Sequence, residues 1–289
     1  MALNLGKGYT ERFGSNISQM PLLLKAGEAP ASMSRVYHRR LDRTDKEASQ
    51  NWLVNYFDTS DLVAYDDAKR SEKVKIVFTV DNQGRLTEAG KNTLGLINPK
   101  SPLISRAIRL SNEQYDALPG IELTANEFGI INEPLTRKQV LASRLHRILA
   151  RNPDEVPAEF AEDKNLLSAY VASIFRLGKS EHKYYKMMGI YPNAHEDSAK
   201  LRTLCASWLV SRANVYGGYC LDNDYGRLVG LAPEAQVAQN LQVSTQGTRV
   251  IERKITSPTL AQLLALGRPN VPKNCWSTYE TGAKKLFGK

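Results

Sequence analysis

The chain has 289 residues, of which 42% are apolar and 24% charged, values typical of a globular protein with one large domain or two smaller ones. Lys and Arg outnumber Asp and Glu by 39 to 30, and the net charge of +9 favours anionic partners. No apolar run reaches the roughly 18–20 residues that cross a bilayer, and the start, MALNLGKGYTERFG, lacks the apolar core of a secretory signal. We therefore expect a cytoplasmic protein without a membrane partner.

The cysteines and histidines give no sign of a bound metal. The three cysteines, Cys205, Cys220 and Cys275, are odd in number and form no CxxC pair. This pattern argues against a disulfide framework and a zinc ribbon, and it fits a reducing compartment. The four histidines show no ligand spacing, so we expect neither a metal nor a cofactor.

Residues 1–45 are expected to form an extended N-terminal arm, because glycines and prolines interrupt any regular element there. Within the arm, the segment 34–43 carries four arginines against one aspartate, with Tyr37 among them. Basic residues beside an aromatic ring can hold phosphate and stack on a base. The four candidate contact residues are Arg35, Arg39, Arg40 and Arg43.

Residues 46–133 are expected to form a mixed, β-leaning region. The clearest strand is 74–80, which is rich in β-branched residues and is followed by an Asp-Asn-Gln-Gly turn that predicts a hairpin. Ser111 with Gln114 matches a capping box and predicts a short helix. Residues 121–124 alternate like a half-buried strand.

Residues 134–214 are expected to form a helical region with three helices. The first is predicted over 135–151, where Thr136 is followed by glutamine in the capping-box position. Wide apolar stripes predict a second helix over 166–175 and a third over 198–209.

The predicted helix over 135–151 carries five basic residues and no acidic one. Arg137, Arg144 and Arg151 lie seven residues apart and therefore share one face, with Arg147 on the same side. Arginine presents fixed donors that match phosphate oxygens. This face is the second candidate nucleic-acid-binding surface.

Residues 215–289 are expected to return to strands and loops. The pattern predicts a strand at 227–229, a hairpin at 241–251, a short helix at 260–266 and an extended basic tail from residue 268. The predicted fold class is α+β, with a β-leaning N-terminal part, a three-helix middle and a C-terminal hairpin with an extended basic tail.

Three short patterns resemble ligand-binding motifs but fail on spacing. Residues 178–180, Gly-Lys-Ser, lack the earlier glycine and the preceding strand of a phosphate-binding loop. His195-Glu196 lacks the second histidine of a zinc protease. Residues 222–226 place glycine at position five of a calcium loop that needs it at six.

Asp224, Glu252 and Lys254 suggest one catalytic alternative. An acidic residue followed later by Glu-x-Lys on a strand resembles the core of the PD-(D/E)xK nucleases, in which two carboxylates hold Mg²⁺ and the lysine positions water. The competing interpretation is a strand with an exposed salt bridge beside a polar turn.

The leading functional prediction is a non-enzymatic nucleic-acid-binding or nucleoprotein-assembly protein that contacts the phosphate backbone through its basic surfaces. One alternative is a structural subunit that assembles with other proteins, or with itself, through its terminal arms, in a viral or mobile-element particle. The other is the Mg²⁺-dependent nuclease. Each arginine cluster could equally be a solvated face or pair with acidic residues elsewhere in the fold.

Overall fold

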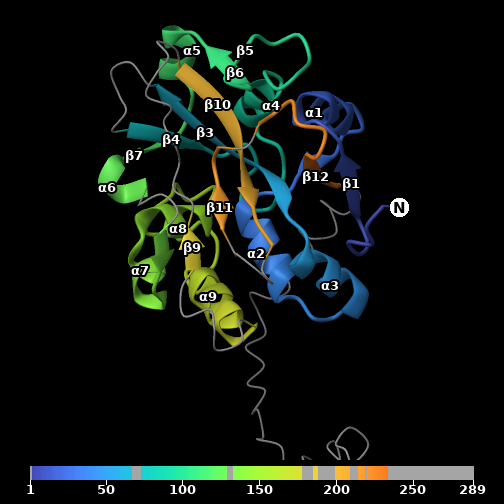
Figure 1. The fold of residues 1–289 in the computed structure, drawn as a ribbon, viewed down its shortest axis with the longest axis vertical. Coiled ribbons are helices and arrows are strands. Elements are labelled where there is room, and N and C mark those ends of the chain that lie inside the picture. The colour runs from blue at the N-terminus through green and yellow to red at the C-terminus, as the bar shows by residue number, and fades with distance from the viewer. Residues whose placement is uncertain are drawn as a thin grey trace, which may run out of the picture. The chain divides into compact units, whose positions relative to one another are not determined.

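The fold was analysed in a computed structural model (Figure 1). The described residues are 2–66, 73–128, 133–177, 185–187, 199–208, 214–218 and 220–233. All of them belong to one compact unit, Met1–Gln242. The predicted hairpin at 241–251, the helix at 260–266 and the basic tail lie outside the described residues.

The described chain combines many short helices with one large mixed sheet, so its class is α+β (Figure 1). The strands are β1 (Tyr9–Phe13), β2 (Ala29–Pro30), β3 (Phe57–Asp66), β4 (Lys73–Val77), β5 (Leu103–Ile104), β6 (Ala107–Leu110), β7 (Ile121–Thr124), β8 (Glu133–Leu135), β9 (Tyr185–Met187), β10 (Ala199–Ala206), β11 (Val215–Tyr216) and β12 (Arg227–Leu231). The helices are α1 (Asn16–Lys25), α2 (Met33–Leu41), α3 (Lys46–Val54), α4 (Glu88–Leu94), α5 (Asn112–Ala117), α6 (Ala125–Phe128), α7 (Arg137–Ala142), α8 (Arg144–Leu149) and α9 (Leu166–Leu177).

The large sheet follows the order β1-β12-β3-β10-β6-β5, with β4 and β7 continuing from β3, and β11 and β2 pairing with β10 and β12. Strand β3 is central and pairs with β10 and β4 antiparallel and with β12 parallel. Its side chains alternate between the faces of the sheet, as the period of a strand requires. Val63 and Tyr65 join one apolar cluster, whereas Leu62 and Ala64 join the other. The sheet therefore has a core on each face.

Residues 1–45 are not an extended arm but part of this core. Strand β1 pairs with β12 along its whole length, from Tyr9 opposite Leu231 to Phe13 opposite Arg227. Met20 of α1 is fully buried in the same unit. The glycines that suggested an arm instead occupy turns between short elements, where their positive φ angles are useful.

The local helix signals are confirmed. Ser111 and Gln114 form a capping box at α5, and Thr136 and Gln139 form one at α7. The helix predicted over 135–151 is nevertheless two helices. Ser143 adopts an extended conformation, with φ −69° and ψ 121°, which ends α7, and its side chain caps α8.

Helix α8, the second of these two helices, has a C-terminal ending that directs Arg151 into the core. Arg151 has a φ of +55°, and the Asn152 N–H donates to the Arg147 carbonyl at 2.9 Å. A left-handed residue followed by this hydrogen bond is the Schellman ending of a helix. Arg151 is fully buried, and its guanidinium lies 3.2 Å from the Asp61 carboxylate of β3, also fully buried.

The third predicted helix, over 198–209, is wrong, because residues 199–206 form the strand β10. All eight residues of β10 are buried, including Lys200 and Arg202, so burial does not follow the polarity of the side chains. The polar side chains of β10 form hydrogen bonds inside the fold. For example, the Arg202 side chain donates to the Tyr65 hydroxyl at 2.8 Å. The helix was predicted because Leu201, Leu204, Cys205 and Trp208 lie at helical spacing.

Other elements agree with the sequence. The helix predicted at 166–175 is α9, and the strand predicted at 121–124 is β7. The strand predicted at 74–80 is β4 followed by an isolated antiparallel bridge between Val80 and Leu86, which is the predicted hairpin. The strand predicted at 227–229 is β12.

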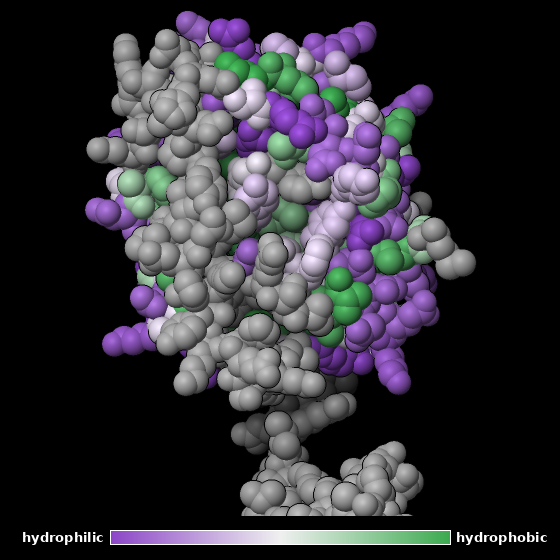
Figure 2. Space-filling model, viewed as in Figure 1, coloured by the Kyte–Doolittle hydropathy of each residue, from purple (hydrophilic) through white to green (hydrophobic). Residues whose placement is uncertain are grey.

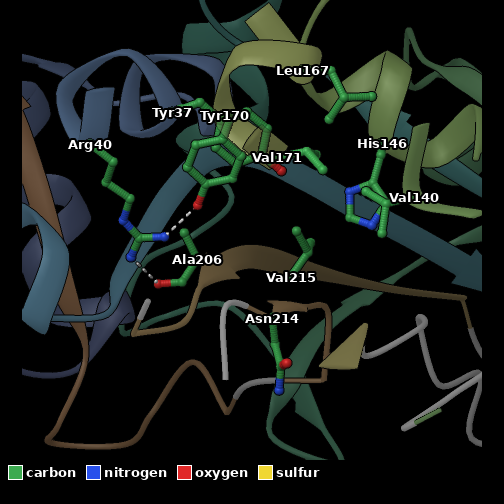
Figure 3. A pocket seen from close by; sticks show the side chains of 10 residues that line it. All are labelled: Tyr37, Arg40, Val140, His146, Leu167, Tyr170, Val171, Ala206, Asn214 and Val215. Atoms are coloured by element: carbon green, nitrogen blue, oxygen red, sulfur yellow. Dashed lines mark hydrogen bonds between the residues drawn. The ribbon is translucent and has the colours of Figure 1, made fainter. Parts of the chain in front are cut away.

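A small cavity of about 10 Å³ lies between α2, α8, α9 and the end of β10 (Figure 3). It has room for about one water molecule. Among the described residues, its wall includes the imidazole of His146, whose Nε2 is buried without a hydrogen-bond partner. Burial lowers the pKa of His146 to about 4, because the charged imidazolium is poorly solvated there.

The described surface is largely hydrophilic on the face that Figure 2 draws. Figure 2 shows hydrophilic residues over much of the described surface on this face, with hydrophobic residues in small separate groups. None of the helices in the described ranges is long and apolar enough to cross a bilayer.

The buried ion pair predicts a large loss of stability on removal of one partner. Arg151→Met should lower the free energy of unfolding by about 3–5 kcal/mol, because it leaves the Asp61 carboxylate buried without a cation. Arg137→Met, at an exposed position of α7, should change it by less than about 0.5 kcal/mol. Urea denaturation measures both, and equal transition midpoints would contradict the structural role of Arg151.

His146 predicts a pH dependence of stability. Its pKa falls from about 6.5 in the unfolded chain to about 4 in the fold, so the unfolded state binds more protons between these values. Above pH 6.5, His146 is neutral in both states and does not lower the free energy of unfolding. As the pH falls from 6.5 to 4, keeping the buried imidazole neutral lowers that free energy by at most about 3 kcal/mol. Between pH 6.5 and 4, the free energy of unfolding of His146→Leu should fall less than that of the parent chain. Urea denaturation at a series of pH values measures both. An identical pH profile for both proteins would refute the assignment.

Candidate functional site

The arginines of the segment 34–43 are engaged within the fold. Arg40 is almost fully buried, and its guanidinium donates to the Tyr170 hydroxyl at 2.9 Å and to the Ser207 carbonyl at 2.7 Å (Figure 3 shows the Tyr170 contact). Arg39 forms an ion pair with Asp42 at 2.5 Å, and Arg43 donates to Ser49 at 2.7 Å. Arg35 is half-buried. A buried guanidinium such as that of Arg40 cannot reach a phosphate backbone.

The four arginines of 137–151 do not form one basic face. Arg137 is exposed, and Arg151 is buried against β3. Arg144 lies 2.5 Å from Glu127 and 3.1 Å from Glu155, and Arg147 lies 2.6 Å from Glu155. The acidic partners of this segment come from α6 and from the loop after α8. The ion pairs that the sequence left open as an alternative are therefore present.

The proposed nuclease residues are not brought together in the part of the chain that the structure describes. Asp224 is exposed in the turn before β12, and Glu252 and Lys254 lie outside the described residues. The described ranges also contain no group of three His, Cys, Asp or Glu side chains that could hold a metal ion.

An exposed group of aromatic side chains gathers where four strands of the large sheet end. In the order β1-β12-β3-β10, Phe13 lies opposite Arg227, Leu228 opposite Asp58, and Ala206 opposite Phe57. The end of β1, the starts of β12 and β3 and the end of β10 therefore lie next to one another. We call the side chains at this edge the aromatic cluster; its members are Phe13, Tyr56, Trp208, Tyr225 and Arg227.

The aromatic cluster is arranged around the guanidinium of Arg227. That group lies 5.0 Å from the ring centre of Tyr56 and 5.4 Å from that of Phe13, distances typical of cation–π contacts. The rings of Tyr56 and Trp208 are 6.3 Å apart, and the Tyr56 hydroxyl donates to the Tyr225 carbonyl. The exposed fractions are 50% for Phe13, 44% for Trp208 and 67% for Tyr225.

A close approach of two chain segments holds the cluster together. The Gly14 N–H donates to the Gly226 carbonyl at 2.9 Å. A Cβ at Gly226 would lie 2.3 Å from the Gly14 carbonyl oxygen, so only glycine fits between Tyr225 and Arg227. On the other side, Arg40 binds the Ser207 carbonyl and thereby fixes the chain directly before Trp208.

The positive charge of Arg227 is compensated within the protein. Its Nε lies 2.8 Å from the Glu11 carboxylate of β1, and another nitrogen donates to the Asn55 side chain. The Arg227 backbone N–H donates to Asp58 at 2.8 Å. The cluster is therefore a largely apolar surface with a neutralised centre, not a free cation for a polyanion.

Buried titratable groups lie directly beneath the cluster. Burial raises the pKa of Asp58 to about 6, although the hydrogen bond from the Arg227 N–H opposes this shift. Burial also raises the pKa of the Cys205 thiol, with the nearby Asp58 carboxylate acting in the same direction. Partial burial raises the pKa of the Tyr56 hydroxyl.

The side chains at this edge are of types that proteins often use to bind partners. Large aromatic side chains bury much apolar area on contact and lose little conformational entropy, so they and arginine are enriched where proteins bind partners. The small cavity beside His146 has room for about one water molecule and is too small for an organic ligand.

Sequence reasoning missed the aromatic cluster because its members are far apart in the chain. The helix predicted over 198–209 includes Trp208, which in the structure follows strand β10, and Tyr225 lies in the segment 222–226 that resembles a calcium loop. A possible signal was the placement of Tyr56, Trp208 and Tyr225 at the ends of apolar segments. That signal becomes informative only when the strand order is known.

Comparison with known proteins supports the fold alone. No protein-family model matches the sequence, and no curated protein matches it. The structure is similar to a solved structure from work on how the C-type lectin fold accommodates massive sequence variation in Nanoarchaeota. The TM-score is 0.50 with 13% identity, over 80% of this chain and 97% of that one.

This similarity corrects the functional prediction. The α+β chain has a fold like that of C-type lectins, which is not the nucleic-acid-binding architecture inferred from its basic charge. The prediction of a nucleic-acid-binding or nucleoprotein-assembly protein is therefore wrong. Its main evidence was the arginines, and most of them hold the fold together through ion pairs and carbonyl contacts.

Proposed function

We propose that this chain is a recognition protein that binds a partner protein through the aromatic cluster. The observation that carries this proposal is the exposure of Phe13, Trp208 and Tyr225 at one edge of the sheet. Exposed aromatic groups of this kind, supported by an ordered scaffold, are typical centres of protein interfaces.

A protein surface is the partner that the chemistry favours. Glu11 neutralises Arg227, so the centre of the cluster offers no free cation for a polyanionic ligand. The flat rings suit an apolar patch on a protein, the Tyr56 hydroxyl is engaged by the Tyr225 carbonyl, and the Arg227 guanidinium contacts Glu11 and Asn55. The small number of free polar groups gives little to bind a strongly hydrated ligand.

The fold separates this surface from the core. Members of the two apolar clusters lie under the sheet faces, whereas Phe13, Trp208 and Tyr225 lie at the ends of strands. The similar structure shows that the C-type lectin fold can accommodate massive sequence variation in another protein. By analogy, the cluster is a place where side chains can change while the sheet remains intact.

The separation predicts a difference in stability between surface and core variants. The triple variant Phe13→Ser, Trp208→Ser and Tyr225→Ser should keep its free energy of unfolding within about 1 kcal/mol of the parent chain. Leu204→Ala, a fully buried change in β10, should cost about 2–5 kcal/mol. Thermal and urea denaturation measure both; a triple variant less stable than Leu204→Ala would place the cluster in the core.

The binding role predicts a loss of affinity on truncation of the cluster. The wild-type chain and the Trp208→Ala/Tyr225→Ala variant are each used to capture partners from an extract of the source cells. A candidate partner is then purified, and its Kd is measured for both chains. We expect the variant to bind at least about 30-fold more weakly, the effect of a hot spot worth about 2 kcal/mol.

Two other exposed apolar residues provide matched controls. Leu22 in α1 and Leu103 in β5 are 50% and 38% exposed and lie outside the cluster. Leu22→Ala/Leu103→Ala should leave the Kd unchanged. Equal weakening by both double variants would contradict the proposal, and loss of binding after removal of glycans from the partner would identify a glycan ligand instead.

A further inference from the structure

Strand β1 forms one margin of the large sheet (Figure 1). The strand order begins with β1, and within the described ranges β12 is the strand that pairs with it. Before β1, the Gly8 carbonyl accepts from the Ala232 N–H at 2.9 Å. After β1, the Gly14 N–H donates to the Gly226 carbonyl at 2.9 Å. The backbone groups of residues 8 and 14 therefore face β12.

The outer side of β1 carries backbone groups that are open to a further strand. In an antiparallel pair, every second residue directs its N–H and C=O to the partner strand, and the residues between direct theirs away. Since residues 8 and 14 face β12, Thr10 and Arg12 face it too. Glu11 and Phe13 face outward, and within the described structure no hydrogen bond engages their backbone groups. An edge of this kind is a template for strand pairing.

Other margins of the sheet are shorter or carry exposed charges. Strands β2, β5 and β11 are each two residues long. Strand β7 has four residues, but its Glu122 side chain is about half-exposed and lies 3.8 Å from the similarly exposed Lys73. Charged side chains at an edge keep other strands away. Among the described margins, the five-residue strand β1 is therefore the most suitable for pairing.

The charges of β1 itself are engaged within the fold. Glu11 lies 2.8 Å from Arg227, and its side chain is only 5% exposed. On the other face of the sheet, Arg12 lies 2.9 Å from the buried carboxylate of Glu28. An added strand with uncharged side chains therefore meets no free charge of the same element.

The outer side of β1 continues into the aromatic cluster. Phe13 is the last residue of β1 and a member of the cluster, and half of its surface is exposed. The Phe13 ring and the Glu11 carboxylate both contact the Arg227 side chain, so residues 11 and 13 share the face that carries the cluster. A strand added to β1 places every second side chain on this face, beside Phe13.

The charges argue against a second copy of this chain as the added strand. In a two-fold antiparallel pair of β1 strands, Glu11 and Phe13 both find outward-facing partners within residues 9–13 in two registers. One register places Glu11 opposite Glu11, and the other places Arg12 opposite Arg12. Like charges directly opposite each other destabilise a strand pair. A segment of a different protein, with apolar or uncharged residues at these positions, avoids both contacts.

We propose that β1 receives an extended segment of the partner protein as an additional strand of the large sheet. The inference rests on the proposed function for the role of the aromatic cluster, and it defines the form of the partner: its apolar patch is carried by an extended segment with alternating apolar residues. Main-chain hydrogen bonds to Glu11 and Phe13 supply affinity, and the apolar side chains beside Phe13 supply specificity.

Amide hydrogen exchange of the full free chain, followed by nuclear magnetic resonance, tests whether the edge is open. The amides of Thr10 and Arg12 should exchange slowly, because β12 binds them, whereas those of Glu11 and Phe13 should exchange fast. Equal protection of all four amides would mean that another part of this chain already occupies the edge, and it would overturn the inference.

The probe for binding is a phage-displayed library of random 12-residue peptides, selected on the full wild-type chain. Phe13→Ala removes the ring and keeps the N–H, whereas Phe13→Pro removes both. Because this N–H faces away from β12, proline costs no bond of the existing ladder. The selected peptides should bind Phe13→Pro at least about 5-fold more weakly than Phe13→Ala, the effect of one backbone hydrogen bond. Equal Kd values for the two variants would overturn the inference.

The wild-type chain decides the matter where Phe13→Pro fails to fold. Saturation with a selected peptide should slow exchange at the Glu11 and Phe13 amides, and a library that yields no such peptide would overturn the inference. Failure of the proposed function alone appears differently. Peptides would then protect Glu11 and Phe13 but bind the Trp208→Ala/Tyr225→Ala variant as tightly as the wild type.

Discussion

The fold depends on the partners of three polar side chains in a run of four buried polar residues in its central strand. Residues 58–61 of β3 read Asp-Thr-Ser-Asp, and none exposes more than 1% of its surface. Uncompensated carboxylates and hydroxyls in such a place would cost several kcal/mol each. The partners of Asp58, Thr59 and Asp61 come from across the chain: Arg151 after α8, the Met33 N–H of α2, the Leu204 carbonyl of β10 and the Arg227 N–H of β12.

This constraint connects the basic composition to the architecture. Arg151 compensates Asp61, and Arg40 binds carbonyl groups at the end of β10, so two of the arginines that suggested a polyanion partner are interior groups. Arg227 compensates Glu11 and at the same time organises the rings of the aromatic cluster. The same polar core that specifies the order of the strands therefore supports the exposed edge where we place recognition.

Sequence reasoning succeeded where the signal was local and failed where it was not. The capping boxes at Ser111 and Thr136 and the strand β7 depend on residues within one turn or one strand, and they were confirmed. Strand β10 was misread as a helix because Leu201, Leu204, Cys205 and Trp208 lie at helical spacing. The roles of Arg40 and Arg151 could not be predicted, since their partners lie up to about 170 residues away in sequence. The aromatic cluster escaped for the same reason.

The central claim is that the edge formed by the ends of β1 and β10 and the starts of β3 and β12 is the recognition surface. Hydrogen–deuterium exchange of the chain with and without its purified partner tests it most directly. The account predicts that added protection on binding concentrates in backbone amides of residues 12–14, 55–58, 206–208 and 225–228. Protection confined instead to α7, α8 and α9, with this edge unchanged, would contradict it.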